Sequence, residues 1–138
     1  MPATASYEVD ILEHILGDSH DSFMPATVYV GLFTVLPTDV TSGTEVASSG
    51  SYARVGVTNS TAKWGPPTTT SGITSLSNND PVVFTTATGT WGTVVGWGLW
   101  DASTSGALIL WNPLVTSADI VSTDPVQFDA GALIVTLA

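Results

Sequence analysis

The stretch Phe84–Trp111, FTTATGTWGTVVGWGLWDASTSGALILW, decides the fold of this chain. Residues Thr93–Trp100 alternate as in a β-strand, and both of the resulting faces are apolar or bare. The pattern predicts a central strand covered on both faces, because a strand open to water alternates apolar with polar residues. Turn-forming residues follow at Asp101–Gly106, and Ala107–Trp111 returns as a second strand. The stretch is therefore predicted to be a β-hairpin.

Strict alternation divides the first strand of this hairpin between two faces. One face carries Thr93, Val95, Trp97 and Leu99, and the other carries Val94, Gly96, Gly98 and Trp100. The hairpin and its flanks hold Trp91, Trp97, Trp100 and Trp111, four of the five tryptophans in the chain. We therefore expect the hairpin to dominate the buried area. A sugar-stacking platform is the alternative use of these rings, and only Asp101 beside Trp100 supplies a polar neighbour for it.

The length and charge of the chain limit the class of protein to which it can belong. The 138 residues predict a single β-sandwich domain, residues 1–138, in which residues 1–24 form an N-terminal arm and helix. Twelve acidic residues against two basic ones give a net charge of −10, which repels a phosphate backbone, so nucleic acid is not an expected partner. Charged residues make up only 10% of the chain. Either serine and threonine coat the surface, or other subunits cover much of it.

The sequence offers little reactive chemistry. It has no cysteine, so disulfides and thiolate metal sites are excluded. His14 lies beside Glu13, and His20 lies in the segment Asp18–Ser22, which lacks the central glycine and terminal glutamate of a calcium loop. No nucleophile elbow, zinc-protease motif or phosphate-binding loop occurs. We expect no enzyme activity, no cofactor and no metal, and neither a signal peptide nor a membrane span is apparent.

The rest of the chain is predicted as short strands with turns between them. An amphipathic helix is expected over Tyr7–Leu16, docked on its own sheet or on a neighbouring subunit. Strands are expected at Val28–Thr34, Tyr52–Thr58, Ala62–Trp64, Ile73–Leu76, Pro81–Thr85, Val126–Phe128 and Ala132–Leu137. Asn112–Pro125 is expected to be a connection whose Leu114 and Val115 fill the core. The predicted fold class is all-β, an antiparallel sandwich of jelly-roll type with one short N-terminal helix.

Two segments are candidate contact elements. The long loop Leu36–Ser51 and the arm Met1–Ser6 contain backbone that an isolated sandwich gives little reason to order. Arg54 needs a carboxylate partner, either within the chain or across a subunit interface, whereas Lys63 beside Trp64 is an ordinary exposed charge. The candidate interface residues are Pro2, Ala3, Leu36, Pro37, Val40, Val46, Arg54 and Trp100.

Three segments resemble a family of small structural proteins of tailed bacteriophages, often labelled tail-fibre-like. They are PATVYVGLFTVLPTD at Pro25–Asp39, GSYARVGVTNSTAKW at Gly50–Trp64, and FTTATGTWGTVVGWGLWDASTSGALIL at Phe84–Leu110. Together they cover about half of the chain. The family is similar in size and β-content to the jelly-roll cement, or decoration, proteins of phage capsids. At Trp97 and Trp100 relatives often carry a smaller or Phe-type residue, so whether this strand faces the core or a partner stays open.

This resemblance implies a virion structural protein. The leading hypothesis is a capsid cement protein on the outer capsid surface, assembled in the cytoplasm of a bacterial host, with the major capsid protein and a second copy of itself as partners. As a homo-oligomer it is expected to form a dimer, because closed symmetric pairs are the commonest assembly. The competing hypothesis is a tail-fibre or receptor-binding component. A third, from another class, is a glycan-binding module.

Overall fold

The computed structural model describes residues 24–137 of the chain. Within that range it contains β-strands and one short helix. They are β1 (Thr27–Val35), β2 (Thr44–Glu45), β3 (Val55–Thr58), α2 (Thr61–Trp64), β4 (Thr68–Thr70), β5 (Ile73–Ser77), β6 (Val82–Val83), β7 (Gly92–Trp100), β8 (Leu108–Ile120), β9 (Gln127–Phe128) and β10 (Ile134–Leu137). Every strand pairing is antiparallel. The expected helix Tyr7–Leu16 lies outside the described residues.

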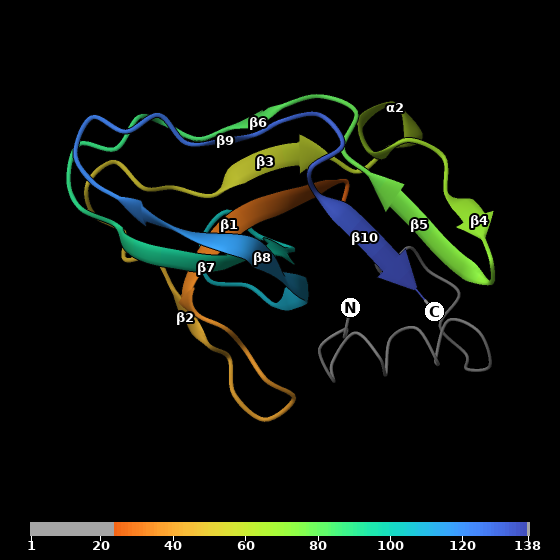
Figure 1. Ribbon diagram of the computed structural model, residues 1–138, viewed down its shortest axis with the longest axis horizontal. Helices are drawn as coiled ribbons and strands as arrows, with labels where there is room; N and C mark the ends of the chain where they lie inside the picture. The colour runs from red at the N-terminus through yellow and green to blue at the C-terminus, as the bar shows by residue number, and fades with distance from the viewer. Residues whose placement is uncertain (1–23, 138) are drawn as a thin grey trace.

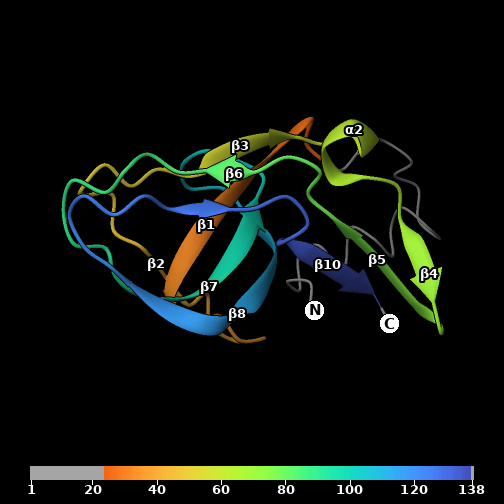
Figure 2. The same cartoon turned by 45° about the horizontal axis from the view of Figure 1, so that its top comes forward.

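Three antiparallel sheets make up the fold. The largest has five strands in the order β2-β1-β7-β8, with β3 also paired to β1, and β10-β5-β4 and β6-β9 form the other two. The β6–β9 ribbon runs along one side of the five-stranded sheet, and β10, β5 and β4 lie beside it (Figure 1). The same arrangement is seen in the tilted view of Figure 2. The all-β antiparallel sandwich is thus confirmed, whereas the jelly-roll strand order stays a prediction.

The core lies between the five-stranded sheet and the β6–β9 ribbon. Its aromatic side chains pack edge to face, with Trp91 5.2 Å from Tyr52 and 6.3 Å from Phe84 between ring centroids. Phe128 on β9 lies 6.5 Å from Trp97 on β7, so the two layers meet through rings. Aromatic pairs of this geometry add about 0.5–1.5 kcal/mol each beyond the area they bury. Trp91 and Trp97, from the predicted tryptophan hairpin and its flank, thus lie in the core, while the share of buried area that the hairpin supplies stays a prediction.

The predicted central strand is β7, which lies between β1 and β8. Trp97 and Leu99 face the core and Trp100 faces the other side, as alternation predicts, and all three are at most 5% exposed. Val94 also belongs to the core, although strict alternation placed it opposite Trp97. The pairing register shifts between Val94 and Gly96, and this β-bulge reverses the face for the residues before it.

Strand β8 is longer than predicted, since it continues to Ile120 where Asn112–Pro125 was expected to be a connection. Between the pairs Val94↔Ala118 and Gly96↔Pro113, β7 advances by two residues and β8 by five. The extra residues bulge outward, so Leu114 packs against the core while Val115 is fully exposed. The expectation that Val115 fills the core was therefore wrong. Pro113 is compatible with β8 because β8 is an edge strand.

Two other local predictions were also corrected. Ala62–Trp64 was expected to be a strand, but it belongs to the helical turn α2. The carbonyl of Ser60 accepts the N–H groups of both Lys63 and Trp64, which closes one turn. The predicted strand Tyr52–Thr58 begins only at Val55. Tyr52 is not free to join the strand because its side chain reaches β1, as described below.

The outer face of the five-stranded sheet, turned away from the core, is built over a pair of glycines. Gly31 on β1 and Gly98 on β7 lie directly opposite each other. A Cβ atom on Gly31 would stand 2.7 Å from Cζ3 of Trp100 and 2.9 Å from Oε1 of Glu45. A Cβ atom on Gly98 would meet Phe33 and Trp100 at 2.8 and 3.1 Å. The absence of side chains at these two positions leaves room for the Phe33 and Trp100 rings, whose centroids lie 5.0 Å apart.

Gly31→Ala should therefore destabilise the protein by about 1–3 kcal/mol, because the added methyl group overpacks a closed site. Gly56→Ala on β3 is the matched control, since Gly56 is exposed and its Cβ would come no closer than 3.2 Å to another atom, the ring edge of Tyr29. We expect the control to change the free energy of unfolding by no more than about 0.5 kcal/mol. Urea unfolding followed by tryptophan fluorescence measures both variants. If Gly31→Ala lost as little stability as the control is expected to lose, the outer face would have room above Gly31.

Candidate functional site: a charged cluster that joins two loops

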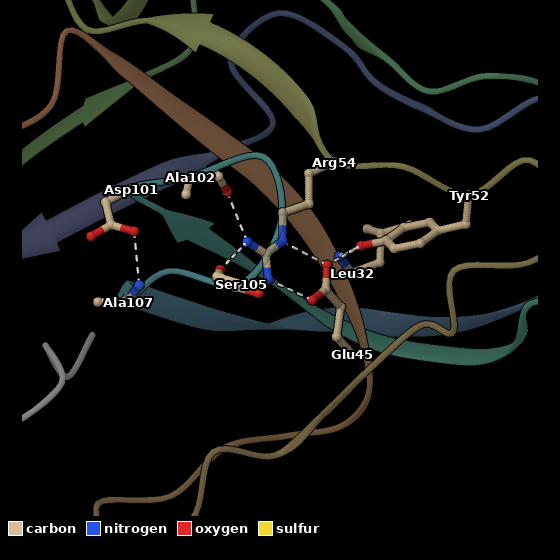
Figure 3. Close-up of polar contacts among 8 residues, drawn as sticks. All are labelled: Leu32, Glu45, Tyr52, Arg54, Asp101, Ala102, Ser105 and Ala107. Atoms are coloured by element: carbon tan, nitrogen blue, oxygen red, sulfur yellow. Dashed lines mark hydrogen bonds and ion pairs between the residues drawn. The ribbon is translucent and has the colours of Figure 1, made fainter.

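The most elaborate polar site in the described residues stands on this outer face. We call Glu45, Tyr52, Arg54 and Trp100 the Arg54 cluster; Figure 3 shows the hydrogen bonds of its first three members. Glu45 comes from β2, Trp100 from the end of β7, and Tyr52 and Arg54 from the segment that leads into β3. The cluster therefore joins the segment Glu45–Arg54 to the end of β7, which lies far along the chain.

Arg54 is the centre of the cluster. Its Nε and Nη2 atoms donate to Oε1 and Oε2 of Glu45 at 2.8 and 2.7 Å, a two-point ion pair. Its Nη1 atom donates to the carbonyl oxygens of Ala102 and Ser105 at 2.8 and 2.7 Å. The guanidinium carbon also lies 4.1 Å from the centre of the Trp100 ring, in a cation–π contact. The planar fork of arginine suits this combination, which a lysine ammonium cannot reproduce.

Tyr52 connects the ion pair to β1. Its hydroxyl donates to Oε1 of Glu45 at 2.8 Å and accepts the backbone N–H of Leu32 at 2.9 Å. On this side of β1, β3 pairs with Thr27–Val30 and β2 pairs with Phe33 and Val35. Leu32 lies between the residues that pair with β3 and those that pair with β2. Its N–H is therefore bound by the Tyr52 hydroxyl instead of by a backbone carbonyl of a neighbouring strand.

Burial sets the electrostatics of the cluster. The side chain of Arg54 is 8% exposed and that of Glu45 is 26% exposed. Burial raises the pKa of the Tyr52 phenol well above its ordinary value, and the nearby Glu45 carboxylate adds to the effect. With its pKa raised in this way, Tyr52 stays a neutral hydrogen-bond donor at physiological pH. Each polar atom in these three side chains has a hydrogen-bond partner, so the cluster stabilises the fold and leaves no free group for acid–base chemistry.

Two surface loops are held by this cluster. The loop Asp101–Gly106 is bound through the carbonyl oxygens of Ala102 and Ser105, and Asp101 Oδ1 closes it by accepting the N–H of Ala107 at 2.7 Å. The other loop runs from Leu36 to β2, whose Glu45 binds Arg54. Its tip is a tight turn in which Thr38 and Thr41 exchange backbone hydrogen bonds of 2.9 and 3.3 Å. Both loops are thereby fixed to the same side chain.

The candidate interface residues are found in different environments. Val40 is 91% exposed at the tip of the projecting loop, and Leu36 is half-buried against Gly96. Pro37, Val46 and Trp100 are buried within the single chain, so their side chains are used in the fold itself. Pro2 and Ala3, like His14 and His20, lie outside the described residues. The assignment of these residues to an interface stays a prediction.

The carboxylate predicted for Arg54 is present within the chain, and it is Glu45. The sequence did not identify Glu45 or Tyr52 as its neighbours. A signal was available, because Glu45, Tyr52 and Arg54 are close in sequence and glycines at 43 and 50 permit the chain to fold back. Lys63 has its own ion pair, to Asp80 at 2.6 Å, and both of these side chains are about half exposed.

Other searches of residues 24–137 give no reactive centre. No group of three His, Asp or Glu side chains there is placed to hold a metal ion. A surface hollow of about 320 Å³ lies against β4, β5 and β10 and is lined by uncharged residues, among them Trp64, Thr68 and Ile134. No helix in this part of the chain is long and apolar enough to cross a membrane.

The fold and this cluster define a β-sandwich whose polar side chains hold loops in place. Residues 2–136 match the model of the family described as podophage GP4 fiber I protein gp80. Because the match spans nearly the whole chain, the protein belongs to this family. The resemblance to tail-fibre-like phage structural proteins is thereby confirmed. No curated protein matches the chain.

A double-mutant cycle tests the energetic role of the Arg54 cluster. Arg54→Met should lower the free energy of unfolding by about 2–3 kcal/mol. This is somewhat less than the loss expected when one partner is removed from a fully buried ion pair, because Glu45 keeps partial contact with water. The double variant Glu45→Gln, Arg54→Met should lose less than the sum of the two single losses, since it leaves no unpaired charge.

Lys63→Met is the matched control for this cycle, because it removes the only other basic residue from an exposed ion pair. Its effect should stay within about 1 kcal/mol. Urea unfolding at constant ionic strength measures the wild type, the three variants of the cycle and the control. The account of the cluster fails if Arg54→Met is no more damaging than Lys63→Met.

Proposed function

We propose that this protein is a non-enzymatic structural subunit of a phage tail fibre, carried in the virion. The observation that carries the proposal is the family match over residues 2–136, whose description names a podophage fibre protein. The description of the matched family supports the tail-fibre hypothesis, and similarity in size and β-content supports the capsid-cement hypothesis. A role on the capsid surface, with the major capsid protein as partner, is the competing proposal.

The chemistry of the described residues supports a structural role. The buried polar side chains of the Arg54 cluster are all engaged in hydrogen bonds that fix loops and strands. What the chain presents outward is a rigid turn with Val40 at its tip and a fixed loop at Asp101–Gly106. Ordered, projecting loops on a rigid sheet are suited to contact with other proteins.

The glycan-binding alternative finds less support. A sugar-stacking site needs an exposed aromatic ring, and four of the five tryptophans are at most 6% exposed, namely Trp64, Trp91, Trp97 and Trp100. The Trp100 ring is also occupied by the Arg54 guanidinium. Trp111 on β8 is half-buried, so it offers only part of a ring to solvent.

Copy number and position in the particle test the proposal together. Quantitative mass spectrometry of purified virions, with isotope-labelled peptides of this protein and of the major capsid protein, should give a copy number far below that of the capsid protein. Immunogold labelling should place the protein on the tail, and particles that lack it are the control for antibody specificity. A copy number close to that of the major capsid protein, with label over the capsid, would contradict the fibre proposal and support the cement role.

A further inference from the structure

The three-stranded sheet β10-β5-β4 is an uncharged part of a strongly acidic chain. Its strands Thr68–Thr70, Ile73–Ser77 and Ile134–Leu137 carry no charged residue. The chain as a whole has a net charge of −10, and its two basic residues are already paired with Glu45 and Asp80. Two copies therefore repel each other wherever carboxylates face one another, and an uncharged sheet is a surface at which they can meet.

Strand β4 forms an open edge of this sheet. It is the last strand in the order β10-β5-β4, and all three of its threonines are exposed. It pairs with β5 through a two-residue turn in which Ser71 and Gly72 have φ of 52° and 80°, the geometry of a tight primed hairpin. Edge strands are usually guarded by lysine, proline or a bulge, and none of these interrupts Thr68–Thr70.

The hairpin register determines which backbone groups of β4 point outward. Thr70 pairs with Ile73 next to the turn, and Thr68 pairs with Ser75 two residues further along. In a two-residue hairpin these are the hydrogen-bonded pairs, so the residue between them directs its N–H and C=O away from the partner strand. That residue is Thr69, whose outward groups face the side on which the sheet has no further described strand.

We propose that two copies of this chain pair through β4, antiparallel about a two-fold axis at Thr69. The N–H of Thr69 in each copy donates to the C=O of Thr69 in the other, and the two three-stranded sheets become one sheet of six strands. Thr68 then lies opposite Thr70 of the second copy. The sequence Thr-Thr-Thr reads the same in both directions, so it satisfies the self-complementarity that a two-fold interface requires. Cross-strand threonine pairs contribute to such contacts.

The size of the edge sets the strength of the contact. Pro67 lacks an N–H, so the ladder ends one residue before Thr68. Three residues per copy form an interface well below the roughly 1,000 Å² expected of a stable complex, and the dimer should form only at high protein concentration. In a particle that holds several copies close together, the effective concentration strengthens the same contact. The pairing is independent of whether the protein sits on the tail or on the capsid.

Two double variants of β4, one acidic and one basic, test this pairing. Thr68→Asp with Thr70→Asp places like charges opposite each other across the two-fold axis, and so does Thr68→Lys with Thr70→Lys. Each double variant should remain monomeric in sedimentation equilibrium at concentrations where the wild type dimerises. An equimolar mixture of the two should associate more tightly than the wild type, because every Asp then faces a Lys.

The control variant has the same two substitutions, to Asp or to Lys, at Thr85 and Thr86 instead. Both of these residues are exposed and lie outside the strands. It should dimerise nearly as the wild type does, and circular dichroism checks that all variants fold. In the wild type itself, amide exchange of Thr69 should slow as protein concentration rises. The proposal is overturned if the wild type stays monomeric up to its solubility limit, if the Asp variant associates like the wild type, or if the mixture stays monomeric.

Discussion

The outer face of this protein depends on one buried guanidinium. A charge that is 92% removed from solvent is costly unless it is paired and hydrogen-bonded, and Arg54 meets that requirement with a carboxylate, two carbonyl oxygens and an aromatic ring. These partners belong to three segments, since both carbonyl oxygens come from the Asp101–Gly106 loop. The constraint on a single side chain thus fixes where β2, the Asp101–Gly106 loop and the end of β7 lie relative to one another.

The glycine pair beneath the cluster serves the same arrangement. Gly31 and Gly98 lack side chains where Trp100 and Phe33 need the space, and the Trp100 ring then becomes the surface on which Arg54 stacks. A central strand with bare positions is weakened intrinsically, since glycine loses more backbone entropy than other residues. The rings and the ion pair compensate for that weakness. This explains why both faces of β7 are covered although the described chain supplies a full second layer on only one of them.

Much of the fold could be predicted because the signals are local. The alternation in Thr93–Trp100 and the turn residues after Asp101 specified β7 and its hairpin. The bulge near Val94 could not be predicted, because it depends on how many residues β8 places opposite a single position of β7. The helical turn α2 was not predicted, because a segment as short as Ala62–Trp64 is too short to show either helical or strand periodicity.

The candidate site was predicted in part, for a physical reason. That Arg54 needs a carboxylate follows from the cost of an unpaired buried charge, but the choice of Glu45 depends on the path of the loop between β1 and β3. Tyr52 binds the N–H of Leu32 because Leu32 lies between the stretches of β1 that pair with β3 and with β2. That position is defined only once the strands are paired. The short spacing of Glu45, Tyr52 and Arg54 and the glycines at 43 and 50 suggest that the chain folds back there, but they do not specify which atoms meet.

The central claim is that the outer face is closed within one chain and does not wait for a partner. Amide hydrogen exchange of Leu32, followed by NMR on dilute monomeric protein, tests it most directly, because this N–H is protected only by the Tyr52 hydroxyl. The account predicts that Leu32 exchanges as slowly as its core neighbour Val30, through global unfolding alone. Rapid exchange of Leu32 while Val30 stays protected would show that the cluster opens in the isolated chain, and would contradict the account.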